Sequence, residues 1–341
     1  MIADRKKLFD SFTVTRQWPK NIANTERNYF QHEVRRSFPR ADLVTFRNVF
    51  VSGEGVVFNF FRTFLPSLPH PEFEKDYGFK YRLINLLKRK KIKLPDRKYL
   101  LISNAWTFNY FHWFLDAMPR LIAIEDQCSE WTLLLPDNHQ AGYIQACLGL
   151  FQFKGIEYFP ANAYVSLKEL IMPEHIVTTG NFNPSVMKSM RERLLRLASF
   201  EGLEKKEDYR KIYVSRKRAQ FRYVLNEAEV EAEMTARGFK IICFEDYTFR
   251  QQIAMMSCCS YFAGIIGSNL VNMMFMPENG KVLQFTQKEN GNDNCYFSLA
   301  SVFQLDFYCQ FCEFVDTRPG AYWNLSVDIL KMKDNLNLML K

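Results

Sequence analysis

Short apolar runs alternate with amphipathic runs of helical period along the second half of the chain. The apolar runs are rich in β-branched and aromatic residues, as expected of buried strands. They are residues 211–215, 240–244, 261–266 and 281–285. Between them, apolar positions recur every three or four residues, which predicts helices over 226–238, 249–257 and 269–275. Strands that alternate with helices predict an α/β fold with a parallel, doubly wound sheet, and such sheets bind ligands at the carboxyl ends of their strands.

The first half of the chain has a less regular pattern. Residues 42–61 contain two runs of β-branched and aromatic side chains around Ser52-Gly53-Glu54-Gly55, which predicts a hairpin. Residues 98–103 and 131–136 are further apolar runs of strand length. A helix is predicted over 183–197, where Asn183 can cap the first turn and Pro184 occupies its first position.

Two helix ends and one linker are predicted in the second half. Asn226 and Glu229 have the spacing of a capping box at the start of the helix over 226–238, and Gly238 is a suitable terminator. The polar segment 201–210 is predicted to be a linker. The chain is therefore divided into domains at 1–200 and 201–341, and the final helix could pack back on the first domain.

A histidine and an aspartate lie four residues apart in the aromatic segment 108–121. If the segment is helical, His112 and Asp116 share one face, one turn apart, and Pro119 kinks or interrupts the helix. Burying charge among Phe, Trp and Leu is costly unless it is paired. The pair is therefore either a hydrogen-bonded pair in the core or a functional site, and the segment alone does not decide between them.

Candidate phosphate ligands follow two of the predicted strands. Arg216 comes directly after the strand 211–215, and Arg222 precedes the next helix. Guanidinium groups bind diphosphates with paired hydrogen bonds. Gly264 and Gly267 lie in a strand-to-helix turn, where free amides attract phosphate. Either feature alone is also typical of an ordinary surface, but together they favour an anion site. The same rule on strand ends adds Ser215 and Glu245 to the candidates.

Composition and charge narrow the class of protein. The 341 residues are 48% hydrophobic and 16% aromatic, which indicates a globular protein. No apolar run is long enough for a transmembrane helix, and the first residues lack the apolar core of a signal peptide, so we expect a cytoplasmic protein. The net charge is +8, and residues 86–98 form the densest basic run. A run of this kind is usually a solvated face, and no nucleic-acid-binding motif accompanies it. If the run is functional, we expect peripheral contact with the inner face of an anionic membrane and no nucleic-acid partner.

The cysteines and histidines do not suggest a metal site. Cys309 and Cys312 form a CxxC pair, but two further ligands at suitable spacing are missing. The histidines do not cluster in a metalloenzyme motif; they are His32, His70, His112, His139 and His175. We therefore expect reduced structural thiols and no metal, and we disfavour a metal-dependent hydrolase that uses His112 and Asp116.

Four motifs in sequence order resemble glycosyltransferase family 61. They are residues 109–121, 211–230, 238–257 and 264–276. The resemblance covers about residues 98–285. It implies a GT-B architecture, in which two Rossmann-like domains face each other across a cleft and the second holds most of the nucleotide sugar. It also implies an inverting transfer from a nucleotide sugar without a catalytic metal or cofactor. Residues 1–200 would then be the acceptor-side domain and 201–341 the nucleotide-sugar-binding domain.

The chain departs from the family in one loop. Members usually have Gly-x-His-Gly-Ala-Gly-Leu-x-Asn, and Gly264, Gly267, Leu270 and Asn272 match that pattern. Ile266 stands at the histidine position, Ser268 at the alanine and Asn269 at the second glycine. The departure removes a donor-side imidazole, while Ser268 and Asn269 add groups that can donate hydrogen bonds to phosphate.

The resemblance turns the candidate residues into predicted roles. Asp116 is predicted to be the catalytic base, and His112 to orient it, share its proton or contact the acceptor. The predicted acceptor-binding residues are Asn109, Tyr110 and Trp113. The predicted donor-binding residues are Ser215, Arg216, Arg222, Asn226, Glu245, Gly267, Ser268, Asn269 and Asn272. We expect a transferase that moves a sugar, first of all from a UDP-sugar, to a glycan or lipid-linked oligosaccharide in surface polysaccharide synthesis. The alternative is a catalytically degenerate nucleotide-sugar or glycan-binding protein.

Overall fold

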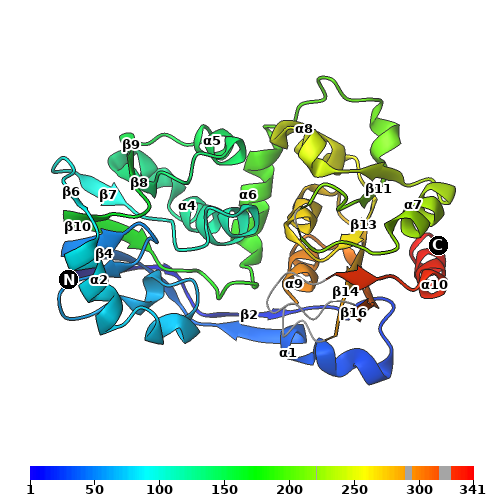
Figure 1. Ribbon diagram of the computed structural model, residues 1–341, viewed down its shortest axis with the longest axis horizontal. Helices are drawn as coiled ribbons and strands as arrows, with labels where there is room; N and C mark the ends of the chain where they lie inside the picture. The colour runs from blue at the N-terminus through cyan, green and yellow to red at the C-terminus, as the bar shows by residue number, and fades with distance from the viewer. Residues whose placement is uncertain (220, 289–293, 315–323) are drawn as a thin grey trace. The chain divides into compact units, whose positions relative to one another are not determined.

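The chain forms two compact units in a computed structural model that describes residues 1–219, 221–288, 294–314 and 324–341 (Figure 1). The first unit consists of Met1–Phe12 and Ser37–Met190, and the second of Thr13–Arg36 and Arg191–Lys341. Both units mix helices with parallel strands, which confirms the predicted α/β class. The predicted functional division between residues 200 and 201 stays a prediction.

The sheet of the first unit is half antiparallel and half parallel. Its order is β1-β4-β10-β7-β8-β9. In that order the strands are Ile2–Phe9, Ala41–Ser52, Tyr164–Pro173, Lys98–Leu100, Thr132–Pro136 and Gly155–Phe159. β4 is antiparallel to β1 and β10, while β10, β7, β8 and β9 run parallel. The short strand β5 (Val57–Phe58) pairs antiparallel with β4 and confirms the predicted hairpin. β6 (Lys91–Ile92) pairs with β10.

Short helices connect the strands of this unit. They are the 3-10 helices at Leu65–Ser67, Pro71–Lys75 and Glu125–Glu130, and the α-helices α2 (Phe79–Lys88), α3 (Tyr110–His112), α4 (Met118–Ile122) and α5 (Gly142–Leu148). The helix α6 (Pro184–Leu195) follows β10, and the chain passes from the first unit to the second within it. Side chains from the antiparallel and parallel strands share one core, as Val44, Leu101, Leu134 and Met172 illustrate. The predicted cap of α6 is confirmed, since Asn183 Oδ1 accepts hydrogen bonds from the amides that open the helix.

The aromatic segment is helical, but it is not a regular α-helix. A π-helical stretch at Trp113–Ala117 separates α3 from α4. The amide of Met118 donates to the carbonyl of Trp113, five residues back. Pro119, which cannot donate and would clash with a preceding carbonyl in a regular α-helix, lies in the first turn of α4. The wider turn accommodates the proline, and such π stretches are frequent at functional sites.

The sheet of the second unit has the predicted parallel, doubly wound form. Its order is β12-β11-β13-β14-β15, and every neighbouring pair is parallel. In chain order, β11 to β15 are Lys211–Val214, Lys240–Ile242, Tyr261–Ile265, Lys281–Thr286 and Asp306–Phe311. The strand order reverses between β11 and β13, because β12 lies on one side of β11 and β13 on the other. This reversal is where such sheets usually bind ligands.

Helices cover both faces of this sheet (Figure 1). α8 (Phe249–Ser257) and α9 (Cys295–Val302) lie on one side, and α7 (Glu227–Ala236) and α10 (Ile329–Met339) lie on the other. α10 packs against β14, β15 and α7, all within the second unit.

The predicted helix over 269–275 is a 3-10 helix, Ser268–Phe275. The remaining elements are β2 (Phe12–Thr15), β3 (Arg35–Phe38), α1 (Gln31–Val34), β16 (Glu313–Phe314), β17 (Leu325–Ser326) and the 3-10 helices Asn24–Tyr29, Lys206–Tyr209 and Phe244–Asp246.

The predicted capping box of α7 is wrong. Asn226 makes no side-chain capping bond. Its amide instead pairs with the main chain of Val327, donating to the carbonyl and accepting from the N–H. A side chain that is satisfied in this way by a distant segment cannot also cap the helix. Gly238 does end the region as predicted, with a φ of 78°.

None of the eight cysteines, all of which lie in the described ranges, forms a disulfide. Burial raises the pKa of Cys312 to about 12, so this thiol is protonated near neutral pH. Across the described ranges, no group of His, Cys, Asp and Glu has the arrangement needed to hold a metal ion. None of the helices in those ranges is long and apolar enough to cross a membrane.

Candidate functional site

His112 and Asp116 form a hydrogen-bonded pair in the first unit. His112 ends α3 and Asp116 lies in the π-helical stretch, and His112 Nδ1 is 2.7 Å from Asp116 Oδ2. Asn109 caps this helix by accepting from the amide of Phe111. The Asp116 side chain is 2% exposed and that of His112 is 21% exposed. The imidazole is therefore the member of the pair that solvent or a substrate can reach.

The second oxygen of Asp116 is also occupied. Thr179 Oγ1 donates to Asp116 Oδ1 at 3.2 Å. A carboxylate can only accept hydrogen bonds, so Nδ1 of His112 carries the hydrogen that it shares with Asp116. In the neutral imidazole, the lone pair is then on Nε2. Nε2 has no hydrogen-bond partner among the described residues.

A buried arginine lies beside this pair. Arg120 is 1% exposed, and it donates to the carbonyls of Pro173 and Ile102 at 2.8 and 2.7 Å. Burial lowers its pKa to about 10, and the charge of Asp116 opposes that shift. Arg120 therefore stays positively charged near neutral pH, beside the Asp116 carboxylate. Arg120 was not among the residues predicted from the sequence, although its spacing of four residues from Asp116 repeats the spacing of His112 and Asp116.

A second histidine also lies at this cluster. Burial lowers the pKa of His175 to about 3, with the charge of Arg120 as a further cause, so His175 is neutral. Its Nε2 is 3.4 Å from the side-chain nitrogen of Asn104. His175, Arg120 and Asp116 line a small cavity of about 10 Å³, room for roughly one water molecule. No sequence signal pointed to His175, because it is 59 positions from Asp116 and in no motif.

Aromatic rings surround His112, but not all of the predicted ones are accessible. The rings of Trp106 and Phe111 each lie 4.9 Å from the imidazole. Trp113 is fully buried and packs against His139, so in this structure it cannot stack on a sugar. Tyr110 is half-buried and Asn109 is exposed. Of the three predicted acceptor-binding residues, only Asn109 and Tyr110 are therefore within reach of a ligand.

Two arginines converge on one glycine in the second unit. Arg216 follows β11, and Gly267 follows β13, at the reversal of the strand order. A Cβ atom on Gly267 would lie 3.1 Å from Arg216 Nη1 and 3.9 Å from Arg222 Nη1. A larger residue would therefore crowd both guanidinium groups. The structure thus brings together three of the predicted donor-binding residues at the edge where the fold binds ligands.

The main chain between the two arginines holds them in place. Arg216 donates from Nε to the carbonyl of Arg222 at 3.2 Å and from Nη2 to that of Phe221 at 2.7 Å. Arg222 adopts a left-handed conformation, with a φ of 64°, and donates to the carbonyl of Ile266 at 3.4 Å. Burial lowers the pKa of Arg216, and the charge of Arg222 lowers it further, while Glu245 opposes the shift. Two cations held so close together are an arrangement that can bind an anion.

The loop after Gly267 adds polar groups. Asn269 is half-buried, and its Nδ2 is buried without a hydrogen-bond partner among the described residues. Ser268 is half-buried beside it. Ile266, at the position of the family's histidine, is 1% exposed. Asn272 is buried and its Nδ2 donates to Gln252 Oε1 on α8 at 3.0 Å.

The other predicted donor-binding residues are placed differently. Ser215 is buried and accepts from the amide of Lys217, so its hydroxyl stabilises the turn after β11. Glu245 is exposed near Arg216. Asn226 is occupied by Val327, so its predicted contact with the donor is not supported.

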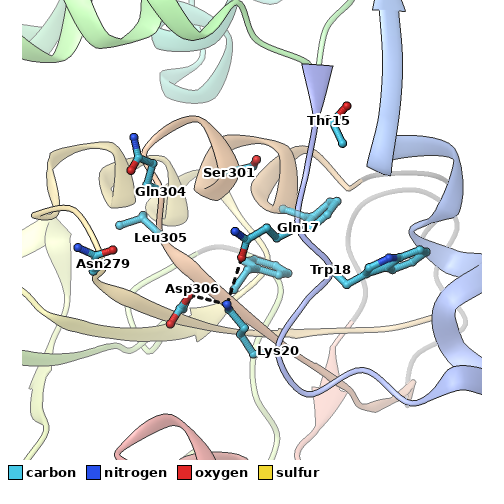
Figure 2. A pocket seen from close by; sticks show the side chains of 11 residues that line it. Thr15, Gln17, Trp18, Lys20, Asn279, Ser301, Gln304, Leu305 and Asp306 are labelled. Carbon is cyan, nitrogen blue, oxygen red and sulfur yellow. Dashed lines mark hydrogen bonds and ion pairs between the residues drawn. The ribbon is translucent and has the colours of Figure 1, made fainter. Parts of the chain in front are cut away.

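A cavity of about 470 Å³ lies at the opposite edge of the same sheet (Figure 2). It is lined by residues at the beginning of β15 and by the segment around Gln17 and Trp18. Lys20 Nζ contacts Asp306 Oδ1 at 3.1 Å and donates to Gln17 Oε1 at 3.2 Å, as Figure 2 shows. The charge of Lys20 is thus already paired, and the cavity faces away from the strand ends that carry the arginines. The cavity is therefore separate from the two arginines.

Both groups of candidate residues lie in a part of the chain that matches a known protein family. The chain matches the family model described as Glycosyltransferase 61 over residues 110–283, just over half of its length. The matched span includes His112, Asp116, both arginines and the Gly267 loop. No curated protein matches the chain. The family match confirms the resemblance seen in the four motifs: this chain belongs to glycosyltransferase family 61.

Proposed function

We propose that this family member is an inverting, metal-independent transferase that moves a hexosyl or pentosyl group from a nucleotide sugar to a glycan or lipid-linked oligosaccharide. The pathway that we propose is the synthesis of a surface polysaccharide such as a capsule or lipopolysaccharide. We further propose a GT-B architecture with the donor held by the second unit. The parallel sheet of that unit, with its reversal of strand order at β11 and β13, supports this proposal.

The observation that carries the proposal is the convergence of Arg216 and Arg222 on Gly267. The two guanidinium groups can each bind a phosphate of the donor, and their charges would stabilise the nucleoside diphosphate that leaves. Asn269 Nδ2, which is buried and unpaired among the described residues, can donate to a phosphate or ribose oxygen. A UDP-sugar is the first donor to test.

We propose His112 as the catalytic base, with Asp116 as the residue that orients it. This reverses the roles predicted from the sequence. Both carboxylate oxygens of Asp116 accept hydrogen bonds and its side chain is almost fully buried, whereas His112 is partly exposed with a free lone pair on Nε2. His112 would take the proton of the acceptor hydroxyl as the hydroxyl oxygen attacks the anomeric carbon and the bond to the diphosphate breaks. The Asp116 carboxylate would stabilise the imidazolium as it forms.

The proposal is tested by thermal shift with UDP-, GDP-, CMP- and dTDP-sugars and the free nucleoside diphosphates. We expect one nucleotide class to stabilise the protein. Arg216→Ala and Arg222→Ala should each weaken diphosphate binding roughly tenfold or more, since a charge-assisted hydrogen bond contributes about 1.5–3 kcal/mol. Lys217→Ala is the control, because its ammonium group is paired with Glu231.

Two results would count against the proposal. Equal losses for the diphosphate and for the nucleoside without phosphates would mean that the arginines are structural. A nucleotide sugar that binds without turnover on any saccharide acceptor would favour the alternative, a catalytically degenerate nucleotide-sugar or glycan-binding protein.

A further inference from the structure

The helix α2 has its apolar side chains on the outside. Phe79, Leu83 and Leu87 recur every four residues on one face, and they are 68%, 42% and 74% exposed. The opposite face points inward with polar groups, including Asn85, which is fully buried, and Tyr81, which donates to Glu54. A helix that merely covers a core has the reverse pattern. The outward apolar face of α2 is therefore a candidate binding surface.

A neighbouring loop extends this apolar surface. Phe60 and Phe61 are 63% and 85% exposed. The loop is tied to the start of α2, since Thr63 Oγ1 donates to the carbonyl of Tyr77 at 2.7 Å and accepts from Arg82 at 3.3 Å. About half of the exposed large apolar side chains in the described residues lie between residues 60 and 87. Such a concentration marks an interaction site.

Basic residues surround these apolar side chains. The segment 79–93 contains seven lysines and arginines and no acidic residue. Lys88, Lys90 and Lys93 are exposed, and none of them forms an ion pair among the described residues. A groove of about 410 Å³ beside Phe60 is lined by Ile92 and Leu94 as well as by Lys91 and Lys93. Apolar and cationic groups are therefore interleaved on one surface.

We propose that this surface docks the protein on an anionic lipid bilayer. We define the docking face as Phe60, Phe61, Phe79, Leu83, Ile84 and Leu87, with the lysines at 80, 88, 90, 91 and 93. The apolar side chains enter the boundary between headgroups and acyl chains, while the lysine stems lie along it and their ammonium groups contact lipid phosphates. The predicted basic run 86–98 supplies four of these lysines and one apolar side chain, Leu87; the rest of α2 and the loop supply the other apolar side chains.

Charge complementarity favours a bilayer over a second copy of this chain. A symmetric dimer through this face would place two sets of unpaired lysines against each other, on a protein whose net charge is already +8. An anionic membrane supplies negative charge and an apolar layer together. Membrane binding goes beyond the proposed reaction, and it is measured without donor or acceptor. A failure of the membrane proposal would therefore not contradict the proposed reaction, and a failure of the proposed reaction would not contradict membrane binding.

The test is co-sedimentation of the full chain with lipid vesicles. We expect binding to phosphatidylcholine vesicles that contain about 30% phosphatidylglycerol, and at least about tenfold weaker binding to phosphatidylcholine alone or at about 0.5 M salt. The double variant Leu83→Ser with Leu87→Ser should bind anionic vesicles at least about tenfold more weakly. Leu330→Ser is the matched control, since Leu330 is 75% exposed on α10 in the second unit.

The triple variant of Lys88, Lys90 and Lys93 to Gln should also lose about tenfold or more on anionic vesicles. Its control replaces Lys205, Lys331 and Lys341 by Gln, which removes the same net charge elsewhere on the surface. Unchanged thermal unfolding of each variant would show that folding is intact.

Three outcomes would overturn the proposal. The first is no binding of the wild type to anionic vesicles. The second is an equal loss in a docking-face variant and its control, which would indicate attraction by net charge alone. The third is a dimer in lipid-free solution that Leu83→Ser with Leu87→Ser converts to monomer, because a second copy would then cover the face.

Discussion

At the scale of single residues, one hydrogen bond decides which member of the His112–Asp116 pair can act as a base. If Nδ1 of His112 donates to Asp116, Nε2 is the available proton acceptor. We expect His112→Ala to lower turnover by about 10²–10⁴-fold. Added imidazole should restore part of the activity, since the rings of Trp106 and Phe111 flank the space that the side chain leaves. Single-turnover rates against imidazole concentration measure this rescue.

Substitutions of Asp116 test the alternative, in which Asp116 rather than His112 is the base. Asp116→Asn should also lower turnover, because the tautomer of His112 is no longer enforced, but imidazole should not rescue it. Rescue of Asp116→Ala by acetate or azide, together with no imidazole rescue of His112→Ala, would make Asp116 the base, as the sequence alone predicted.

The buried His139 gives a prediction about how the free energy of unfolding depends on pH. It is 1% exposed, its Nε2 lies 2.9 Å from Thr107 Oγ1, and burial lowers its pKa to about 4. An unfolded histidine has a pKa near 6.5. As the pH falls from 6.5 towards 4, the unfolded chain binds a proton that the folded protein excludes, so stability is lost. Between pH 7 and 4.5, the wild type should lose about 2–3 kcal/mol more of its free energy of unfolding than His139→Gln.

Urea unfolding at the two pH values measures this difference. His32→Gln, at an exposed histidine, should follow the wild type. If the wild type and His139→Gln lose equal stability, the imidazole of His139 does not titrate as its burial implies.

At the scale of elements, the sequence predicts best where one periodicity continues through an element. The strands β11 to β14 and the helices α6 and α8 occur where their patterns place them, because a buried strand and an amphipathic helix each leave a regular pattern. The π-helical stretch at Trp113–Ala117 leaves no such pattern. The misplaced cap at Asn226 has a similar cause, since its partner Val327 is about a hundred residues away in the sequence.

The loop after β13 gives a prediction about binding of the nucleoside diphosphate. Asn269 stands where the family has glycine, and its Nδ2 is buried without a partner among the described residues. We expect Asn269→Gly to weaken binding of the nucleoside diphosphate about threefold to tenfold, the contribution of one neutral hydrogen bond. Asn279→Gly, on the opposite edge of the sheet, is the control and should leave this affinity unchanged. Isothermal titration calorimetry measures both.

Ile266→His, which introduces the family's usual histidine, is a second test of the same loop. Ile266 is 1% exposed, so an imidazole there would be buried among apolar groups. We expect lower stability and no gain in activity. A clear gain in turnover would mean that the loop is a damaged form of the family's usual site, and would contradict a donor site rebuilt around Asn269.

At the scale of the whole molecule, the assignment of the N-terminal residues could not be predicted. Residues Thr13–Arg36 belong to the second unit, although most of the N-terminal half forms the first. The amide of Lys20 donates to the carbonyl of Phe307, and Asn21 Oδ1 accepts from the amide of Cys309, so this segment covers the edge of β15. Local periodicity carries no information on such pairing, because the partners are about 290 residues apart. The candidate site has the same limit: His112 and Asp116 share one motif, but His175 joins them only through the fold.

The division into units gives the last prediction. If the donor binds through Arg216, Arg222 and the Gly267 loop, its contacts lie in the second unit. A ligand that binds only the folded state suppresses local opening around its site. We therefore expect the matched nucleoside diphosphate to slow amide hydrogen exchange in residues 215–219 and 266–270, while β8 in the first unit changes little. Arg216→Ala at the same ligand concentration should lose this protection, and Lys217→Ala should keep it. Protection confined to residues 104–121 would place the nucleotide beside His112 instead, and the assignment of donor and acceptor to the two units would have to be exchanged.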